Sequence, residues 1–246
     1  MLRIDAVTKR FAGLAAVNGV TLEVASGQVH GVIGPNGAGK TTLFNLISGF
    51  LLPDEGAIWF HDRDIARMAT HRRTALGIVR TFQNIRLFGG LTVHENVLVG
   101  QHPRARPGLR SIWPTPTAAD RRLRARAEEL LEVFRLTDYR DRRAADLPYG
   151  VAKRLELARA LAAEPALLML DEPTAGMNAS ESRVIAEEIL AVRDRGVTVL
   201  LVEHDMNVVM ECSDQVTVLN FGEKIAAGDP ATIQAAPAVR LAYLGE

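Results

Sequence analysis

A nine-residue segment, residues 34–42, constrains the fold of this chain more than any other feature. Its letters are Gly-Pro-Asn-Gly-Ala-Gly-Lys-Thr-Thr, which fit a pattern of Gly, any four residues, Gly, Lys and then Ser or Thr. The apolar run Val29–Ile33 precedes the segment, and Lys40–Ser48 has the apolar spacing of a helix. We therefore predict a phosphate-binding loop between a β-strand and an α-helix.

The residue types of this loop suit the phosphate groups of a nucleotide. Glycines allow successive backbone N–H groups to turn toward phosphate oxygens, and the N-terminus of the following helix adds positive potential. Lys40 is placed to neutralise the β- and γ-phosphates, and the hydroxyl of Thr41 can bind Mg²⁺. A glycine-rich surface turn is the alternative, and the flanking strand and helix argue against it. The predicted nucleotide-binding residues of the loop are Gly34, Asn36, Gly37, Ala38, Gly39, Lys40, Thr41 and Thr42.

A second segment, residues 167–172, is an apolar run that ends in two carboxylates. Enzymes with phosphate-binding loops use one carboxylate to hold hydrated Mg²⁺, and Asp171 suits this role. The next residue, Glu172, can orient or deprotonate an attacking water. An acidic turn that opens the following helix is the alternative, and the phosphate-loop pattern upstream favours the catalytic interpretation.

Strand and helix patterns alternate in the last third of the chain. Ala166–Leu170 and Val197–Val202 are continuous apolar runs typical of buried parallel strands, and Ala179–Arg195 between them has helical spacing. In the first quarter, Leu2–Val7 and Val17–Val24 alternate apolar and polar residues, as half-buried strands do. This order predicts an α/β fold with a mainly parallel sheet covered on both faces.

The middle of the chain has a different pattern because it lacks strand signals. Residues 103–117 contain four prolines and predict an irregular insertion, whereas Asp120–Leu136 has the spacing of an amphipathic helix. The predicted arrangement is a single domain, 1–246, with a nucleotide-binding core of 1–88 and 161–246 and an inserted helical subdomain of 89–160.

Charge, hydropathy and cysteine content limit the partners and the location. Lys plus Arg and Asp plus Glu each number 29, so the net charge argues neither for nor against a nucleic-acid partner, and we expect none. No apolar run approaches the roughly 18 residues that cross a bilayer. A single cysteine, Cys212, cannot form an internal disulfide, which suits a reducing compartment. We therefore expect a cytoplasmic chain.

Further motifs resemble the ABC ATPase family, and the likeness covers nearly the whole chain. Residues 147–161 are similar to the family's signature segment, in which Gly150 would contact ATP bound to the opposite subunit. Gln83 is similar to the glutamine-loop residue that contacts Mg²⁺ and water, and His204 to the switch histidine near the γ-phosphate. Phe11 lies where the family has an aromatic side chain that stacks on adenine.

The resemblance implies a phosphate-loop ABC ATPase core with N-terminal antiparallel strands, and ATP and Mg²⁺ as cofactors. The implied catalytic residues are Glu172, His204 and Gln83. The implied Mg²⁺ ligands are Thr41, Gln83 and, through water, Asp171. The implied activity is that of an Mg²⁺-dependent ATPase coupled to transmembrane transport.

Six short segments resemble the branched-chain amino-acid importer branch of the family, namely residues 80–88, 91–99, 147–150, 175–178, 202–206 and 242–246. The insertion at 103–117 is similar to the LivG-type subunit rather than to its shorter LivF-type partner. The resemblance implies a second ABC ATPase subunit in a homo- or heterodimer, two transmembrane permease subunits and, indirectly, an extracytoplasmic substrate-binding protein. It also implies that the chain is peripheral on the inner face of the cell membrane.

The signature segment departs from the usual family pattern, Leu-Ser-Gly-Gly-Gln. Pro148 replaces the serine, Tyr149 the first glycine and Val151 the glutamine, so a hydroxyl that reaches the γ-phosphate is lost. Asn178 replaces the usual D-loop aspartate and keeps hydrogen-bonding capacity without the charge. Both changes are typical of the importer branch. Two alternatives stay open: a non-transport ABC ATPase, and a nucleotide-switch scaffold that clamps ATP and hydrolyses it weakly.

Two groups of residues have both a structural and a functional interpretation. Leu87, Phe88 and Leu91 are either partner contacts or core residues. Seven arginines form either a solvated helix face or a contact for anionic lipid headgroups. They are Arg104, Arg106, Arg110, Arg121, Arg122, Arg124 and Arg126.

Overall fold

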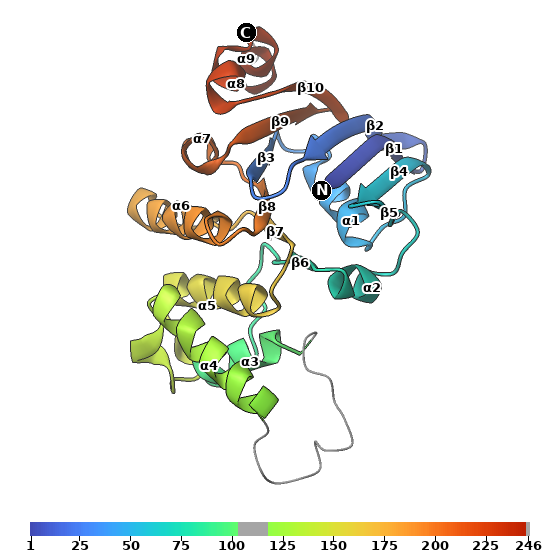
Figure 1. Cartoon of the computed structure of the whole chain (residues 1–246). Coiled ribbons are helices and arrows are strands. Elements are labelled where there is room, and N and C mark those ends of the chain that lie inside the picture. Colours follow the sequence, from blue (N-terminus) through green and yellow to red (C-terminus); the bar gives the residue numbers. More distant parts are fainter. Residues whose placement is uncertain (103–117, 245–246) are drawn as a thin grey trace. The chain divides into compact units, whose positions relative to one another are not determined.

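The computed structural model describes residues 1–102 and 118–244. The chain divides into two compact units, which can be followed in Figure 1 by the colours along the sequence. The two-sheet unit combines Met1–Arg80 with Ala166–Glu246, and the helical unit is Thr81–Pro165. The sequence pattern placed the helical insert at 89–160, and its proline-bearing stretch, 103–117, lies outside the described residues.

The two-sheet unit contains a four-stranded antiparallel sheet in the order β2-β1-β4-β5. Its first strand alternates, so Leu2 and Ile4 are buried while Arg3 and Asp5 are exposed. The buried residues share a core with Phe44 of the helix that follows the phosphate loop. The strands are β1 Leu2–Phe11, β2 Leu14–Val24, β4 Glu55–Phe60 and β5 Arg63–Asp64.

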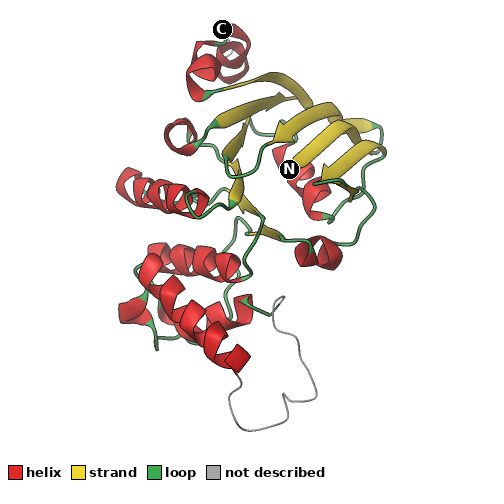
Figure 2. Cartoon of the chain, in the orientation of Figure 1, coloured by secondary structure: helices red, strands yellow, loops and turns green. Residues whose placement is uncertain are grey.

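The second sheet of this unit has six strands in the order β10-β9-β3-β8-β7-β6, and Figure 2 shows both sheets in yellow. Each neighbouring pair from β9 through β3, β8 and β7 to β6 is parallel, whereas β10 runs antiparallel to β9. Every residue of β3, β7 and β8 is buried, in agreement with their continuous apolar sequences. The strands are β3 Val29–Ile33, β6 Ile78–Arg80, β7 Leu167–Asp171, β8 Thr198–Val202, β9 Gln215–Asn220 and β10 Glu223–Gly228.

Helix α1, Lys40–Ser48, ends at Gly49, whose φ of 83° is common just after a helix. The fully buried guanidinium of Arg73, on α2 Thr70–Ala75, donates to the carbonyl oxygens of Leu46 and Ile47 at this end of α1. A cation is favourable there because the last carbonyls of a helix lack helical partners. Four further helices are described in the unit, α6 Ala179–Arg193, α7 Met206–Cys212, α8 Pro230–Ala235 and α9 Pro237–Leu244.

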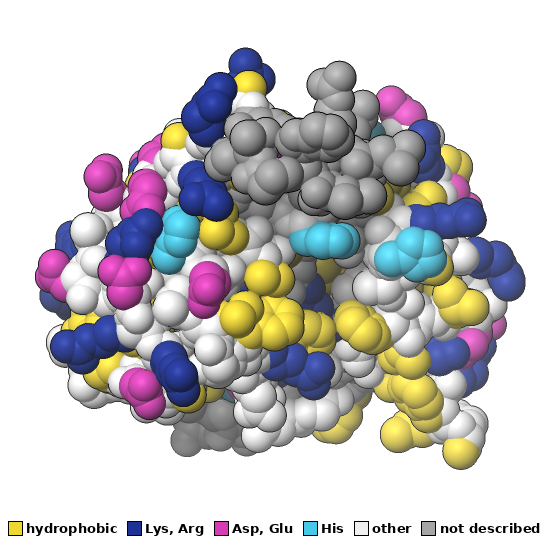
Figure 3. Space-filling model, turned by 90° about the horizontal axis from the view of Figure 1, so that it is seen from below, with side chains coloured by type: hydrophobic (Ala, Val, Ile, Leu, Met, Phe, Trp, Pro, Cys, Tyr) yellow, Lys and Arg dark blue, Asp and Glu magenta, His cyan; other side chains and the backbone are white. Residues whose placement is uncertain are grey.

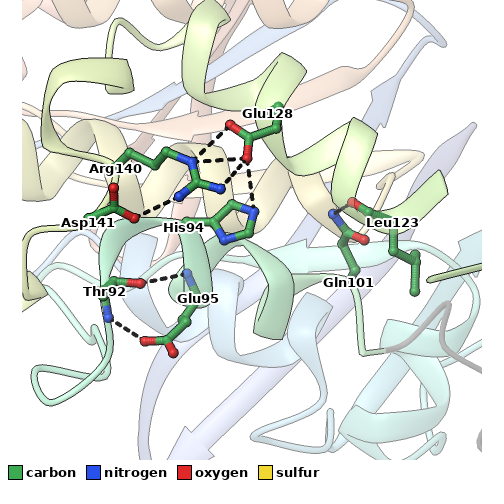
Figure 4. Close-up of polar contacts among 8 residues, drawn as sticks. All are labelled: Thr92, His94, Glu95, Gln101, Leu123, Glu128, Arg140 and Asp141. Carbon is green, nitrogen blue, oxygen red and sulfur yellow. Dashed lines mark hydrogen bonds and ion pairs between the residues drawn. The ribbon is translucent and has the colours of Figure 1, made fainter. Parts of the chain in front are cut away.

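The helical unit contains α3 Val93–Gly100, α4 Ala118–Val133 and α5 Tyr149–Ala162, with short 3-10 turns η2 Thr137–Tyr139 and η3 Ala144–Asp146. The guanidinium of Arg140 donates to the Glu128 carboxylate of α4, as Figure 4 shows. At Gly100 a Cβ would collide with the carbonyl oxygen of Arg159, so glycine permits the close approach of α3 and α5.

The predicted α/β fold class, with N-terminal antiparallel strands and a helical insert, is confirmed. The helix expected over Asp120–Leu136 ends earlier, at Val133, because Arg135 adopts a left-handed φ of 51°. Helices α2, α7, α8 and α9 were not predicted from the sequence, because helices of six to eight residues are too short for a clear periodic pattern. Among the residues that the structure describes, none of the helices has the length and apolar character required to span a membrane.

Candidate functional site

Three neighbouring strands of the six-stranded sheet position all predicted site residues of the two-sheet unit except Phe11, which ends β1. The phosphate loop follows β3, Asp171 and Glu172 lie at the end of β7, and His204 lies two residues after β8. The strands pair in parallel in the order β3-β8-β7, so their carboxyl ends meet at one edge of the sheet. This edge is where open α/β sheets bind ligands.

Two glycines of the phosphate loop occupy positions that a side chain would block. Gly39 has a φ of 99°, and a Cβ there would collide with the carbonyl oxygen of Ala16. At Gly34, with a φ of 153°, a Cβ would collide with the carbonyl oxygen of Leu219. The path of the loop between these two backbone segments therefore requires glycine at both positions.

Lys40 is the first residue of α1 and lies almost buried across the loop. Its Nζ donates to the carbonyl oxygens of Gly34, at 2.6 Å, and Pro35, at 3.1 Å. Burial lowers the pKa of this ammonium, and the nearby carboxylates of Glu172 and Asp171 oppose that shift. The first N–H groups of α1 lack helical partners, and Gly39 supplies no side-chain cap. A phosphate group in the loop would meet both the ammonium and these N–H groups.

Asp171 ends β7 and forms a buried ion pair with Arg80, the last residue of β6. The distance from Arg80 Nη2 to Asp171 Oδ2 is 2.6 Å. Nη1 of the same guanidinium donates to Asn45 Oδ1, at 2.7 Å, and to Ser48 Oγ, at 3.1 Å, on α1. Arg80 therefore ties the carboxylate to the helix that also carries Thr41, the other predicted Mg²⁺ ligand of this unit.

Glu172 and His204 contact each other directly. The distance from His204 Nε2 to Glu172 Oε1 is 2.6 Å, and the His204 side chain is 45% exposed against 12% for Glu172. The backbone of Glu172 has a left-handed φ of 49°, which is uncommon for a residue other than glycine. Its N–H donates to the carbonyl oxygen of Val202 at 2.9 Å, so the segments that follow β7 and β8 are still hydrogen-bonded where they leave the sheet.

A hollow of about 320 Å³ lies over the loop and brings most of these residues together. Phe11, at the end of β1, is not among its lining residues; it is half-exposed, with the Lys9 ammonium 5.7 Å from its ring centre. The hollow is lined by Ala16, Asn36, Gly37, Ala38, Gly39, Lys40, Thr41, Thr42, Glu172 and His204.

The oxygen donors of this region suit a hard cation. The Thr41 hydroxyl and the Asp171 carboxylate are the ligand types that Mg²⁺ prefers, and Mg²⁺ commonly takes few protein ligands together with phosphate and water oxygens. In the described ranges, 1–102 and 118–244, no cluster of three or more His, Cys, Asp or Glu side chains could hold a metal by itself. The residues therefore fit Mg²⁺ bound together with a nucleotide.

Gln83 lies in the helical unit, where buried charges hold its segment. The ammonium of Lys153 on α5 donates to the Gln83 carbonyl oxygen at 3.1 Å. One turn later, the Glu156 carboxylate accepts from the Arg86 N–H at 3.3 Å. Lys153 and Glu156 are 2% and 3% exposed, and burial raises the pKa of Glu156. Residues 83–86 are thus attached to α5 at both ends.

Gly150 lies in the first turn of α5, whose N-cap residue is Pro148. Proline offers no side-chain hydrogen bond to the helix start, and Tyr149 is half-exposed. The N-terminal N–H groups keep the positive end of the helix dipole although the serine hydroxyl of the usual signature is missing. In the two-sheet unit, Asn178 uses its side chain differently, because its Oδ1 accepts from the N–H groups of Ser180 and Glu181 and caps α6.

The family model described as ABC transporter matches residues 17–175. This chain belongs to the ABC transporter family. The high-affinity branched-chain amino acid transport ATP-binding proteins BraF of Pseudomonas aeruginosa and LivG of Escherichia coli K12 are 44% and 42% identical over 250 residues, covering 100% of this chain and 98% of each relative. The crystal structure of the ADP conformation of MJ1267, an ATP-binding cassette of an ABC transporter, superposes with a TM-score of 0.87 at 33% identity, covering 100% of this chain and 99% of that one. The family resemblance predicted from the sequence is confirmed.

In this ABC chain, the arginine cluster is only partly described. Arg104, Arg106 and Arg110 lie outside the described residues, and the other four arginines are on α4. Arg126 pairs with Glu129 at 2.5 Å, and Figure 3 shows Lys, Arg, Asp and Glu side chains interspersed on one face of the molecule. Mixed charge of this kind is typical of a solvated surface.

Several charged residues of this ABC chain with buried side chains received no role from the sequence, among them Arg80, Lys153, Glu156 and Glu203. Arg80 and Glu203 lie directly beside apolar strands, which is an unusual place for a charge and the signal that could have identified them. Their partners are distant in sequence, for example 91 residues for Arg80 and Asp171, so the pattern alone could not supply the contacts.

Proposed function

We propose that this chain is the ATP-hydrolysing motor subunit of an ABC importer for branched-chain or related amino acids. The observation that carries the proposal is the contact between Glu172 and His204 in the hollow that also contains Lys40. The transport assignment is supported by the names of BraF and LivG, which describe ATP-binding proteins of branched-chain amino acid transport.

In the proposed reaction, Lys40 and the N–H groups at the start of α1 bind the β- and γ-phosphates of ATP. Thr41 directly, Asp171 through water and Gln83 would hold Mg²⁺, which supplies charge neutralisation for the phosphates when bound. Phe11 stacks on the adenine ring. These residues fix the nucleotide so that its γ-phosphate lies beside Glu172.

Glu172 is the proposed general base, which orients a water molecule and accepts its proton as the water attacks the γ-phosphate. His204 holds the Glu172 carboxylate through their 2.6 Å contact and contacts the γ-phosphate. The partly buried setting of Glu172 strengthens these electrostatic interactions because fewer water molecules compete with them.

The site is completed, in this proposal, by a second ABC ATPase subunit. Gly150 and the positive end of α5 of that subunit face the γ-phosphate in trans, so ATP joins the two subunits and its hydrolysis releases them. Two transmembrane permease subunits receive this motion, and an extracytoplasmic binding protein delivers the amino acid. The chain therefore works on the inner face of the cell membrane, with residues 84–99 as the docking segment.

A scaffold that clamps ATP and hydrolyses it weakly is a second candidate, because Pro148 removes the signature hydroxyl. Steady-state ATP hydrolysis by the full chain separates the two. Glu172→Gln should lower kcat by about 10²–10⁴-fold while ATP still binds. The matched control is Glu211→Gln, an exposed glutamate on α7, and it should hydrolyse ATP like the unaltered chain. If the unaltered chain hydrolysed ATP no faster than Glu172→Gln, the ATP-clamping scaffold would be the correct function instead of the motor.

A further inference from the structure

Glu203 is a buried carboxylate that the reaction described above does not use. It follows β8 directly and is 2% exposed. One oxygen, Oε1, accepts from both the N–H and the hydroxyl of Thr174, each at 2.7 Å. The other oxygen, Oε2, accepts from the N–H of His204 at 3.1 Å. Three donors thus converge on one carboxylate, and they include the backbone of a predicted site residue.

These hydrogen bonds join the two chain segments that carry the Glu172–His204 contact. Thr174 is two residues beyond Glu172, and His204 is the residue after Glu203. Any shift of one segment against the other would therefore stretch both the bonds of Glu203 and the 2.6 Å contact between Glu172 and His204. The carboxylate is a cross-link next to the site and not a group within it, because both of its oxygens already accept hydrogen bonds from the protein.

The backbone of Glu172 gives a reason for such a cross-link. A non-glycine residue with a φ of 49° is strained and persists only where its surroundings determine it. The bond from the Glu172 N–H to Val202 fixes one side of this residue. The bonds from Thr174 to Glu203 fix the other side, so the strained conformation is held between them.

Burial raises the pKa of Glu203, as does the negative charge of Glu172, while the hydrogen bonds from Thr174 and His204 lower it. A buried carboxylate is a costly way to satisfy two backbone N–H groups, because burial penalises its charged form. A charged acceptor makes shorter and stronger hydrogen bonds than a neutral one. The carboxylate therefore does more than satisfy these donors, because it also fixes their positions.

We propose that Glu203 is a positioning residue for ATP hydrolysis, whose carboxylate sets the placement of Glu172 relative to His204 by tying Thr174 to the His204 backbone. The proposal rests on the hydrolytic roles of Glu172 and His204 given above. It assigns Glu203 no contact with the nucleotide, so its removal should affect turnover far more than ATP binding.

Two variants of the full chain test this proposal. Glu203→Gln keeps the shape of the side chain but leaves one oxygen in place of two, so it cannot accept from Thr174 and His204 together. Thr174→Val keeps the backbone N–H and removes only the hydroxyl donor. Glu211→Gln makes the same chemical change as the first variant on the exposed face of α7. Thermal unfolding establishes that each variant is folded.

The readouts are the ring signal of His204 in ¹H–¹⁵N spectra, kcat and the Kd for ATP. The chain has six histidines, and loss of a signal in His204→Ala assigns the ring. In Glu203→Gln the ring signal should move and kcat should fall about tenfold to hundredfold, the usual effect of misplacing a catalytic group. The Kd should stay within about twofold, and Thr174→Val should show smaller changes in the same direction.

An unmoved His204 signal, or an unchanged kcat, in folded Glu203→Gln would overturn the proposal. If that variant does not fold, the same comparison in Thr174→Val decides it. Failure of the proposed function gives a different result. The unaltered chain would then show no ATP hydrolysis that Glu172→Gln abolishes. In that case the His204 signal still decides whether Glu203 positions the ring.

Discussion

The two units of this ABC chain use buried charge differently. In the two-sheet unit, Lys40 lines the hollow over the phosphate loop, and Arg80 holds Asp171, the residue before Glu172. In the helical unit, the buried pair Lys153 and Glu156 holds a loop segment, residues 83–86, and the first turn of α5 lacks the signature serine. The buried charges of the first unit lie beside the predicted nucleotide site, whereas those of the second attach one loop to one helix.

This difference predicts that substitutions in the two units have separable effects. Changes around the hollow should alter ATP binding, turnover or the stability of the two-sheet unit. Changes to the Lys153–Glu156 pair should leave ATP binding intact and loosen the segment that carries Gln83. Four substitutions or conditions test this separation.

Lys40→Ala should have the largest effect on ATP binding. Loss of the ammonium removes a charged donor to the phosphates, which should weaken ATP binding about a hundredfold. Isothermal titration with ATP measures the change, and Lys224→Ala, at an exposed lysine of β10, is the matched control. Normal ATP binding by Lys40→Ala would refute the assignment of the phosphate loop.

Arg80→Met should destabilise the two-sheet unit, because it leaves the buried Asp171 carboxylate without its partner guanidinium. Breaking a buried pair in this way typically costs about 3–5 kcal/mol of unfolding free energy. Urea unfolding measures the loss, and Arg10→Met, which removes an exposed pair with Glu55, should change stability much less. Equal losses in the two variants would contradict the structural importance of the Arg80–Asp171 contact.

Acidification should weaken the two-sheet unit through His30 on β3. Burial lowers the pKa of His30 from its ordinary 6.5 to about 4. Between these two pH values the folded state therefore binds fewer protons than the unfolded state. Stability is therefore retained above about pH 6.5 and falls by up to about 3 kcal/mol as the pH drops toward 4. In His30→Gln, unfolding measured across this range should lose that part of the pH dependence. An identical pH profile in the variant would exclude His30 as its source.

Lys153→Met should have the smallest effect on the site around the hollow, because the contacts of Lys153 lie within the helical unit. It removes the donor to the Gln83 carbonyl, so amides of residues 83–86 should exchange with solvent about tenfold faster. ATP affinity should not change. Faster exchange around the phosphate loop, or weaker ATP binding, would show that the two units are not separable in the way described.

The sequence predicted those parts of the site whose residues are consecutive. The loop 34–42 and the pair Asp171–Glu172 are local motifs beside apolar strands, and the parallel pairing of these strands brings the motifs to one edge of the sheet. The ends of helices were predicted less accurately where the backbone conformation of a single residue decides them, as at Arg135 after α4. The buried contacts of Glu203 and Lys153 could not be predicted, because their partners lie 29 and 70 residues away and neither spacing follows a periodic pattern.

The most direct test of the motor assignment is co-purification of the tagged chain and its Glu172→Gln variant from detergent-solubilised native membranes, with partners identified by mass and ATP hydrolysis measured on the same samples. The account predicts that both forms bring down two multi-spanning proteins and a second, shorter ATPase, and that only the unaltered form hydrolyses ATP. A chain that brings down no membrane protein would contradict the transport function, and equal hydrolysis by the two forms would contradict the role of Glu172.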